Sequence, residues 1–356
     1  MTEHEHPALS RLRDRVRTAN GERSPLRIRA GGTKDFYGNQ TAGDLLDPRE
    51  VRGIVDYAPT ELVVTVRGGT PLAELEAALA EHQQLLPFEP PHFGATATVG
   101  GAVAAGIAGP RRVAAGSIRD FILGARMIDG RGDVLAFGGR VMKNVAGYDM
   151  GRVLAGSLGT LGVLVDVSLK VLPRPVAERT LRFEIDEANA IRQLNEWGGQ
   201  PLPITASAWC EGILCLRLSG ARAAVDAAQA RLGGSVVDDA ERWWGELREQ
   251  RHAYFATGPH RALWRLSVPP ATPPLGLGPT LIEWHGGQRW LSGEVDVTTL
   301  RSKVAAVGGH ATRFRGGDTH IPAFHALDPV LARLNARLKS EFDPAGIFNP
   351  GRLSPL

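Results

Sequence analysis

The chain has 356 residues, of which 43% are hydrophobic and 22% are charged, and this balance excludes an intrinsically disordered protein. The formal net charge is +3, and residues 1–34 alone carry +4 (eight Lys and Arg less four Asp and Glu), so no basic surface for nucleic acid is predicted. The two cysteines, Cys210 and Cys215, cannot ligate a four-thiolate iron–sulfur cluster. At about 150 residues per domain, the length predicts two domains.

In the first half of the chain, β-branched runs alternate with turn residues, which is typical of an α+β domain. Thr70 is expected to cap a helix that starts at Pro71 and ends near residue 82. The expected strands are 27–30, 51–56, 62–67, 122–128, 134–137 and 162–172, with a hairpin turn at 129–133.

Residues 90–110 carry no Asp, Glu, Lys or Arg and are long enough to span a bilayer. Three Pro and five Gly interrupt this segment, so we expect a packed loop and helix and no transmembrane segment.

A second domain is expected after Pro173, because the pattern there changes to strand, helix, strand, strand, helix, strand over residues 180–237. That order is the ferredoxin-like unit. Further strands are expected at 263–268, 281–284 and 289–292, helices at 241–252 and 330–342, and a surface loop at 269–279. The predicted boundaries are 1–176 for the first domain, 177–308 for the second, and 309–356 for a C-terminal segment that returns to the first domain.

Glycine is concentrated between residues 94 and 162, which hold 16 glycines in 69 positions. Such a density indicates a long ligand lying along the backbone, since only small residues let N–H groups approach phosphate or ring atoms. Two segments are expected to bind phosphate: Gly31–Lys34, a turn after a strand, and Thr98–Gly101, a helix start. Neither the P-loop pattern nor a G-x-G-x-x-G strand–helix junction is present.

Five segments, in this order, resemble the flavin-binding domain of the vanillyl-alcohol oxidase / p-cresol methylhydroxylase superfamily. They are RAGGTKD (29–35), TVGGAVAAGIAG (98–109), AGSIRDFILG (115–124), KNVAGYDMGRVLAGSLGTLGVL (143–164) and FDPAGIFNPGRL (342–353). GGRVMKNVAGYD (138–149), QPLPITASAW (200–209) and GGHATRFRGGD (308–318) are further similar to the family of FAD-binding subunits of bacterial glycolate oxidase.

This resemblance implies a two-domain α+β flavoprotein with a ferredoxin-like cap and bound FAD. Thr33 stands where covalent members often have a linking His, so noncovalent FAD is expected. The implied cofactor-binding residues are Gly31, Gly32, Thr33, Lys34, Pro91, Thr98, Val99, Gly100, Gly101, Gly106, Gly116, Ser117, Gly162, Val163 and Asn349.

Catalytic candidates are fewer. Arg265 and Arg313 could hold a substrate carboxylate, and His310 or His320 could act as a base. The stretch 314–320 lacks the His and Asn of the catalytic sister family, and no metal is expected. Lys143 is a further candidate.

The resemblance implies an FAD-binding subunit of a glycolate oxidase complex that converts glycolate to glyoxylate, with a catalytic flavoprotein subunit and an iron–sulfur subunit as partners. The alternatives are a self-sufficient FAD-dependent dehydrogenase for D-lactate or another D-2-hydroxy acid, and a structural subunit without flavin. The expected location is the cytoplasm, with peripheral contact to the inner membrane left open.

Overall fold

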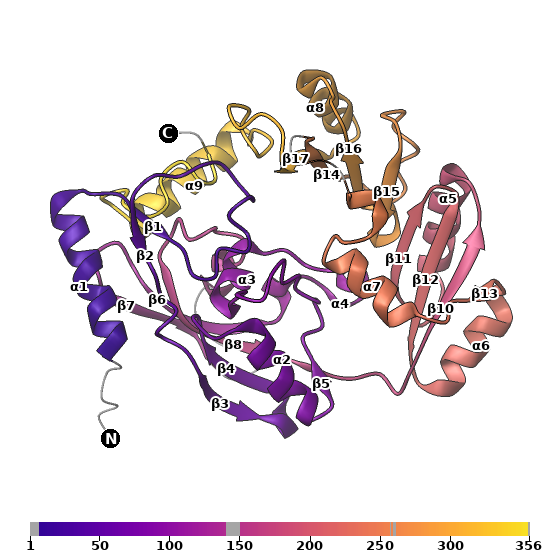
Figure 1. The fold of residues 1–356 in the computed structure, drawn as a ribbon, viewed down its shortest axis with the longest axis horizontal. Coiled ribbons are helices and arrows are strands. Elements are labelled where there is room, and N and C mark those ends of the chain that lie inside the picture. Colours follow the sequence, from indigo (N-terminus) through magenta and orange to yellow (C-terminus); the bar gives the residue numbers. More distant parts are fainter. Residues whose placement is uncertain (1–6, 140–149, 257, 259–260, 355–356) are drawn as a thin grey trace.

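The computed structural model describes residues 7–139, 150–256, 258 and 261–354. Two β-sheets lie side by side along the longest axis, each with its own helices, and the last helix returns to the side of the N-terminal sheet (Figure 1). This arrangement confirms an α+β fold with two sheet-centred parts.

The N-terminal sheet has five strands in the order β3 (Ile54–Ala58), β4 (Val63–Arg67), β8 (Val163–Lys170), β6 (Ile122–Ile128) and β7 (Val134–Gly138). All its neighbouring strands are antiparallel. The expected hairpin around 129–133 is therefore confirmed.

Two groups of helices pack against this sheet. α2 (Leu72–Glu81) and α3 (Val99–Ala105) bury Leu75, Leu79 and Val103 against the strands. In a separate cluster, α1 (Pro7–Glu22) packs with the parallel pair β1 (Leu26–Ile28) and β2 (Asp44–Leu46) and with Phe348 of the C-terminal tail. The tail thereby brings its FNPGRL motif beside β1.

The start of α2 differs from the expectation. The N-cap residue is Pro71, and it makes no side-chain cap. The Thr70 hydroxyl instead accepts a hydrogen bond from the Gly53 amide at 2.8 Å. Thr70 ties the loop before β3 to the helix, and the capping prediction was wrong because this tertiary partner competes for the hydroxyl.

The second sheet has eight strands in the order β13-β10-β12-β11-β15-β16-β14-β17. Its first half comprises β10 (Ala177–Glu184), α5 (Glu187–Gly198), β11 (Ile204–Cys210), β12 (Ile213–Gly220), α6 (Arg222–Leu232) and β13 (Ser235–Val236). The sequence order and the spatial order of these strands are those of the ferredoxin-like unit, as predicted.

The second half of the sheet consists of β14 (Leu263–Ser267), β15 (Thr280–Glu283), β16 (Gln288–Ser292) and β17 (His310–Arg315). β17 pairs with β14, so residues 310–315 lie in the cap sheet. They do not lie in the returning segment to which the sequence assigned them, because their backbone pairs with β14 and completes the edge of the cap sheet.

The remaining elements are short or peripheral: β5 (Gln84–Leu85), β9 (Leu172–Pro173), α4 (Arg112–Ala115), α7 (Ala240–Arg248), α8 (Val297–Ala306) and α9 (Pro329–Phe342). Among the residues that the structure describes, no helix has both the length and the hydropathy needed to cross a bilayer.

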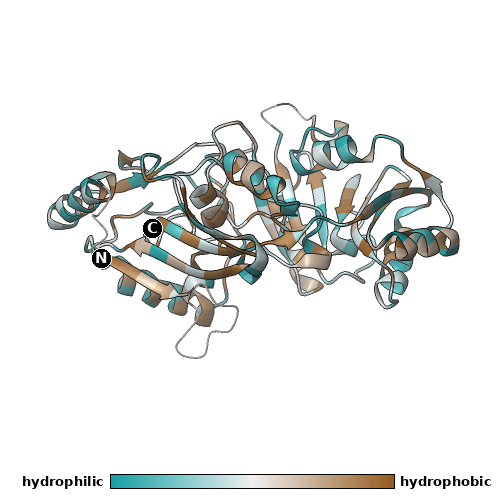
Figure 2. Cartoon of the chain, turned by 90° about the horizontal axis from the view of Figure 1, so that it is seen from below, coloured by the Kyte–Doolittle hydropathy of each residue, from teal (hydrophilic) through white to brown (hydrophobic). Residues whose placement is uncertain are grey.

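The two sheets are joined through an apolar cluster that contains Tyr37 and Leu158 from one side and Leu281, Trp290 and Phe314 from the other. Hydrophobic colouring follows the strands of both sheets (Figure 2). This joint fixes the loop that contains Tyr37 against the cap sheet, and that loop forms the candidate site.

Candidate functional site

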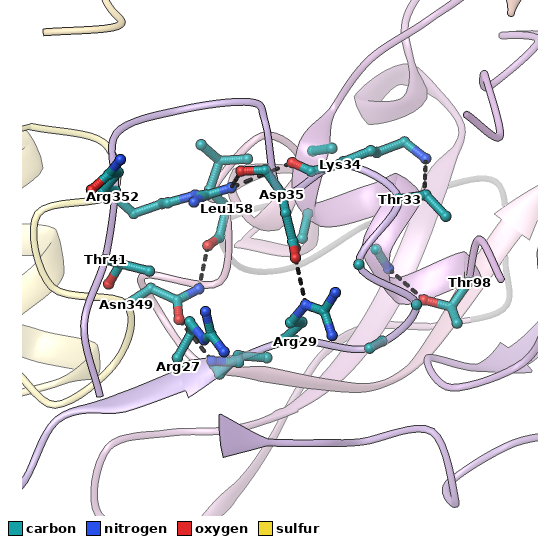
Figure 3. Close-up of a pocket in the computed structure, with 18 residues that line it drawn as sticks. Arg27, Arg29, Thr33, Lys34, Asp35, Thr41, Thr98, Leu158, Asn349 and Arg352 are labelled. Atoms are coloured by element: carbon teal, nitrogen blue, oxygen red, sulfur yellow. Dashed lines mark hydrogen bonds and ion pairs between the residues drawn. The ribbon is translucent and has the colours of Figure 1, made fainter. Parts of the chain in front are cut away.

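A cavity of about 320 Å³ lies between the loop after β1, the start of α3 and the C-terminal tail (Figure 3). Its lining residues are Arg27, Ile28, Arg29, Ala30, Gly31, Gly32, Thr33, Lys34, Asp35, Gln40, Thr41, Thr98, Gly101, Ala104, Ala105, Leu158, Asn349 and Arg352. Seven of the predicted cofactor residues are among them: Gly31, Gly32, Thr33, Lys34, Thr98, Gly101 and Asn349.

The shape of the loop requires both glycines. A Cβ on Gly31 would lie 1.7 Å from the carbonyl oxygen of Thr96, which no side chain can tolerate. Gly32 has a φ of +70°, a left-handed conformation that costs glycine little. The close approach and the positive φ together bend the chain into the cavity wall.

This bend leaves backbone donors without acceptors. The amides of Gly31, Gly32, Thr33 and Lys34 donate no hydrogen bond to any group in the described part of the chain. Successive unpaired amides in such a turn form an anion-binding nest. The first phosphate-binding segment predicted from the sequence therefore has the donors that a diphosphate needs.

Charge favours the same ligand. Arg27, Arg29, Lys34 and Arg352 line the cavity, and Asp35 is the one carboxylate among the lining residues. Asp35 pairs with Arg29, whereas the Arg27 side chain has no hydrogen-bonding or ionic partner among the described residues. Four cations against one anion attract a doubly charged ligand such as a diphosphate.

Lys34 is held at the far end of the loop. Its Nζ donates to the carbonyl oxygen of His92 at 3.1 Å and to the Thr33 hydroxyl at 3.3 Å. Burial lowers the pKa of Lys34 to about 8, and the carboxylate of Glu249 opposes that shift. The His92 ring bonds Glu76 at 2.9 Å, and His92 is absent from the cavity lining.

The second predicted nest, Thr98–Gly101, is not available in the same way. The Val99 amide donates to the Thr70 carbonyl, the Gly100 amide to the Gly68 carbonyl at 2.8 Å, and the Gly101 amide to the Thr98 hydroxyl at 3.2 Å. Three of the four amides of Thr98–Gly101 are therefore engaged within the protein, which leaves this segment fewer free donors than Gly31–Lys34, and phosphate binding by it stays a prediction.

The two neighbouring glycines of α3 have different roles. A Cβ on Gly100 would meet the backbone of Gly68 at 2.8 Å, so Gly100 is required for helix–strand packing. Among the described residues, a Cβ on Gly101 would meet only the Thr98 hydroxyl, at 3.0 Å, and Gly101 lines the cavity. Gly101 is therefore the glycine that keeps space for a ligand.

The other predicted cofactor residues do not line this cavity. They are Pro91, Val99, Gly100, Gly106, Gly116, Ser117, Gly162 and Val163. Gly106 ends α3 with a φ of +64° and packs against Gly156, and Ser117 donates through its amide and hydroxyl to Asp120. Gly162 packs against Met127 and Ile128. Local structure accounts for these residues, and their contact with a cofactor stays a prediction.

Asn349 lies at the centre of the cavity wall and has a φ of +40°. Its side-chain oxygen accepts from the Ile28 amide at 2.7 Å, and its Nδ2 donates to the Leu158 carbonyl at 2.7 Å. Asn349 thus ties β1, the glycine-rich segment and the tail together. This structural role accompanies any contact with a cofactor.

Among the described catalytic candidates, Arg265, His310 and Arg313 lie on the cap strands β14 and β17 and His320 lies in the loop after β17, and none of the four lines the cavity. Arg265 donates to the Tyr37 hydroxyl at 2.8 Å and lies over the rings of Tyr37 and Phe314. It has no carboxylate partner within the described ranges. Burial lowers the pKa of Arg112, and the positive charge of Arg265 adds to this shift. The carboxylate of Asp120 opposes this shift.

Arg313 cannot serve as predicted. It is 4% exposed, and its guanidinium donates to the carbonyls of Gly316 at 3.1 Å and Ile321 at 3.2 Å. These bonds hold the loop after β17. Arg313 is therefore a structural residue, and its assignment as a carboxylate ligand is corrected.

The two histidines differ in setting. His310 stands on the edge strand β17; partial burial of its ring, and then the charges of Arg265 and His325, lower its pKa, which favours the neutral form. His320 is exposed in the loop after β17. Lys143 lies outside the described residues, and no group of three potential metal ligands occurs among those described.

Sequence reasoning missed Arg27, Arg29 and Arg352 in the cavity and Arg112 and Tyr37 near Arg265. Arg352 follows the recognised Asn349-Pro-Gly motif by one residue, and Arg29 precedes the glycine turn, so both lay inside quoted motifs. Arg112 gave no signal, because only the fold brings it near the cap.

Comparison with known proteins gives the family. Residues 9–138 match the model of the FAD binding domain. The glycolate oxidase subunit GlcE of Escherichia coli is 47% identical over 343 residues, which cover 96% of each chain. The chain belongs to the GlcE family. The glycolate oxidase subunit GlcD of Bacillus subtilis is 30% identical over 48% of this GlcE-family chain and 37% of its own length.

Solved structures support the fold alone. An alkyldihydroxyacetonephosphate synthase superposes with a TM-score of 0.64 at 15% identity, covering 96% of this chain and 74% of that one. The FAD binding domain match includes β1 and the glycine turn that follows it, and it ends at Gly138. The cofactor is FAD, and the donors and charges around Gly31–Lys34 fit its diphosphate.

Proposed function

We propose that this chain is the FAD-binding subunit of a glycolate oxidase complex, which oxidises glycolate to glyoxylate and passes electrons from its flavin to a partner subunit. The observation that carries this proposal is the near full-length similarity to a glycolate oxidase subunit. A D-lactate dehydrogenase of Anaerostipes hadrus is 34% identical over only 44% of this chain, so the self-sufficient D-lactate enzyme is the weaker alternative.

The chain's own residues divide the work. The amides of Gly31–Lys34 and the cations around them would hold the diphosphate of a noncovalently bound FAD. Thr33 lines the cavity and His92 does not, which supports the absence of a covalent link to a histidine. FAD, once bound, supplies the hydride acceptor for oxidation of the hydroxyl-bearing carbon.

On the cap side, Arg265 would hold the carboxylate of a small 2-hydroxy acid, since its guanidinium has no ionic partner in the described structure. His310 is the candidate to take the hydroxyl proton, because the shift of its pKa favours the neutral ring. Its side chain is exposed at the start of the edge strand β17, and it does not line the cavity. We therefore expect the isolated chain to bind FAD and to oxidise glycolate poorly.

The catalytic partner would be a second flavoprotein subunit, and a separate iron–sulfur subunit would accept the electrons, since this chain has only two cysteines. Burial raises the pKa of both thiols to about 11, which keeps them protonated and poor ligands. The complex would work in the cytoplasm or on the inner face of the membrane.

Reconstitution tests this proposal. The three subunits are co-expressed, and glycolate-dependent dye reduction is compared with that of a complex lacking this chain. Glycolate oxidation that needs this chain and its bound FAD supports the assignment. Equal activity without this chain would contradict it.

A further inference from the structure

An exposed apolar stripe runs along the first half of α9 and the residues before it. Leu327, Val330, Leu331 and Leu334 are 52%, 55%, 47% and 55% exposed. The described part of the chain has eight exposed large hydrophobic side chains, and these four lie within eight consecutive residues. The other four, Leu45, Val153, Val176 and Val236, are scattered over the sequence and need no explanation.

The stripe is one helix face. Within α9, Leu331, Leu334 and Leu338 follow one another at spacings of three and four residues, which places these side chains on one side of the helix, and Leu327 lies just before the helix. At its C-terminal end, Leu338 and Phe342 pack with Phe137 of the N-terminal sheet. The protein itself therefore covers one end of this face and leaves the other end bare.

The exposed first half of α9 gains little stability from packing against the rest of its own chain. All residues from 326 to 337 are exposed, although Asp328 caps the helix and Pro329 occupies its first position. A helix of fewer than about 12–15 residues is marginal in water without packing of an apolar face. Figure 1 shows α9 as a single unbroken helix. An amphipathic helix whose apolar side chains are exposed, as Leu331 and Leu334 are, is the form expected of a docking element.

Charges beside the stripe indicate which occupant fits. Arg333 and Arg337 are exposed, and their side chains have no acidic partner within the described ranges, whereas Lys339 pairs with Asp343. Two copies of α9 packed antiparallel would bring both Arg333 side chains to one rim, and that repulsion opposes a homodimer. Residues 327–342 carry a net charge of only +1 (three basic less two acidic), which is weak for an anionic membrane.

We propose that Leu327, Val330, Leu331 and Leu334 form the surface on which α9 docks the flavoprotein partner subunit of the complex. The partner surface would be an apolar groove or helix face with carboxylates at its rim, opposite Arg333 and Arg337. This inference rests on the proposed function, because it assumes that the chain works as a subunit.

The test uses the full chain co-expressed with its partner subunits. The double variant Leu331→Asp/Leu334→Asp places two carboxylates on the stripe. The double variant Arg333→Glu/Arg337→Glu reverses the charge beside the stripe and leaves the apolar side chains intact; it is called the rim variant. Val176→Asp, at a side chain that is 77% exposed elsewhere on the chain, is the matched control. The molar mass of each complex is measured by light scattering after size-exclusion chromatography. The flavin content and melting temperature of each isolated chain are also recorded.

We expect every isolated chain to keep its flavin and melting temperature. The stripe variant should bind the partner at least tenfold more weakly, the rim variant more weakly and with less dependence on salt, and the control like the unsubstituted chain. A stripe variant that assembles normally would overturn the docking site while leaving the proposed function intact.

Two further outcomes would also overturn the docking site. One is a homodimer of the isolated chain that is lost in the stripe variant. The other is binding to phosphatidylglycerol vesicles that depends on the stripe while the complex assembles normally. If the unsubstituted chain forms no complex, both the proposed function and this docking site are wrong.

Discussion

Gly101 offers the sharpest test of the cavity, because its replacement should reduce the space for the ligand without disturbing folding. Its Cβ would meet only the Thr98 hydroxyl, at 3.0 Å, so Gly101→Val should fold, and the added methyl groups should occupy part of the roughly 320 Å³ cavity. Forcing extra carbon atoms into a fitted site costs about 1–3 kcal/mol. That range corresponds to FAD binding that is about 5- to 150-fold weaker.

Fluorescence titration of the FAD-free protein gives the dissociation constant, and thermal unfolding without FAD gives the stability. Gly139→Ala is the control, since a Cβ there meets no atom of the described residues within 4 Å. Gly100→Ala should instead lower the stability of the FAD-free protein, because its Cβ would meet Gly68 at 2.8 Å. Unchanged FAD affinity in Gly101→Val would refute the assignment of this cavity to FAD.

Three further results are expected. In the FAD-free protein, the free energy of unfolding of the unsubstituted chain relative to Lys34→Met should rise between about pH 8 and 10.5, by at most about 3 kcal/mol. The reason is that in this range the lysine of the unfolded chain still binds a proton, whereas the buried lysine of the folded chain has lost it. If urea unfolding shows the same difference between the two proteins at every pH, Lys34 is not buried as described. Arg313→Ala should lower the free energy of unfolding by about 1–3 kcal/mol through the freed loop carbonyls, whereas Arg265→Ala should keep stability and FAD and raise the KM of the complex for glycolate; the reverse pattern would exchange their roles. Acid precipitation should release all flavin into the supernatant, and flavin retained in the pellet would show a covalent link.

Local patterns were sufficient for much of the fold. The order of apolar strands and helices after Pro173 predicted the ferredoxin-like half of the cap sheet, because that unit is built from neighbouring segments. The sequence did not place β17 in the same sheet, since its pairing with β14 spans about 45 residues of chain and leaves no local signal. Thr70 was misread for a related reason, as its partner Gly53 lies outside the helix.

The candidate site divides in the same way. Gly31 and Gly32 allowed the loop to be predicted from the sequence, because the backbone at Gly31 approaches Thr96 too closely for any other residue. Thr98–Gly101 looked equally suited to phosphate, but the carbonyls of Thr70 and Gly68 already accept from the amides of Val99 and Gly100, and only the folded chain shows this. Arg313 was misassigned because a strand arginine gives no indication of whether it faces a substrate or a loop carbonyl.

The measurement that tests the central claim most directly is anaerobic flavin reduction in the isolated chain. The purified protein is loaded with FAD, mixed with glycolate or with D-lactate, and followed by its flavin absorbance, alone and after addition of the partner subunits. The account predicts one noncovalent FAD per chain that bleaches slowly or not at all in isolation, since a missing positioned base costs about 10²–10⁴-fold in rate, and that is reduced rapidly in the complex. Failure to bind FAD, or complete bleaching of the isolated chain within seconds, would contradict it.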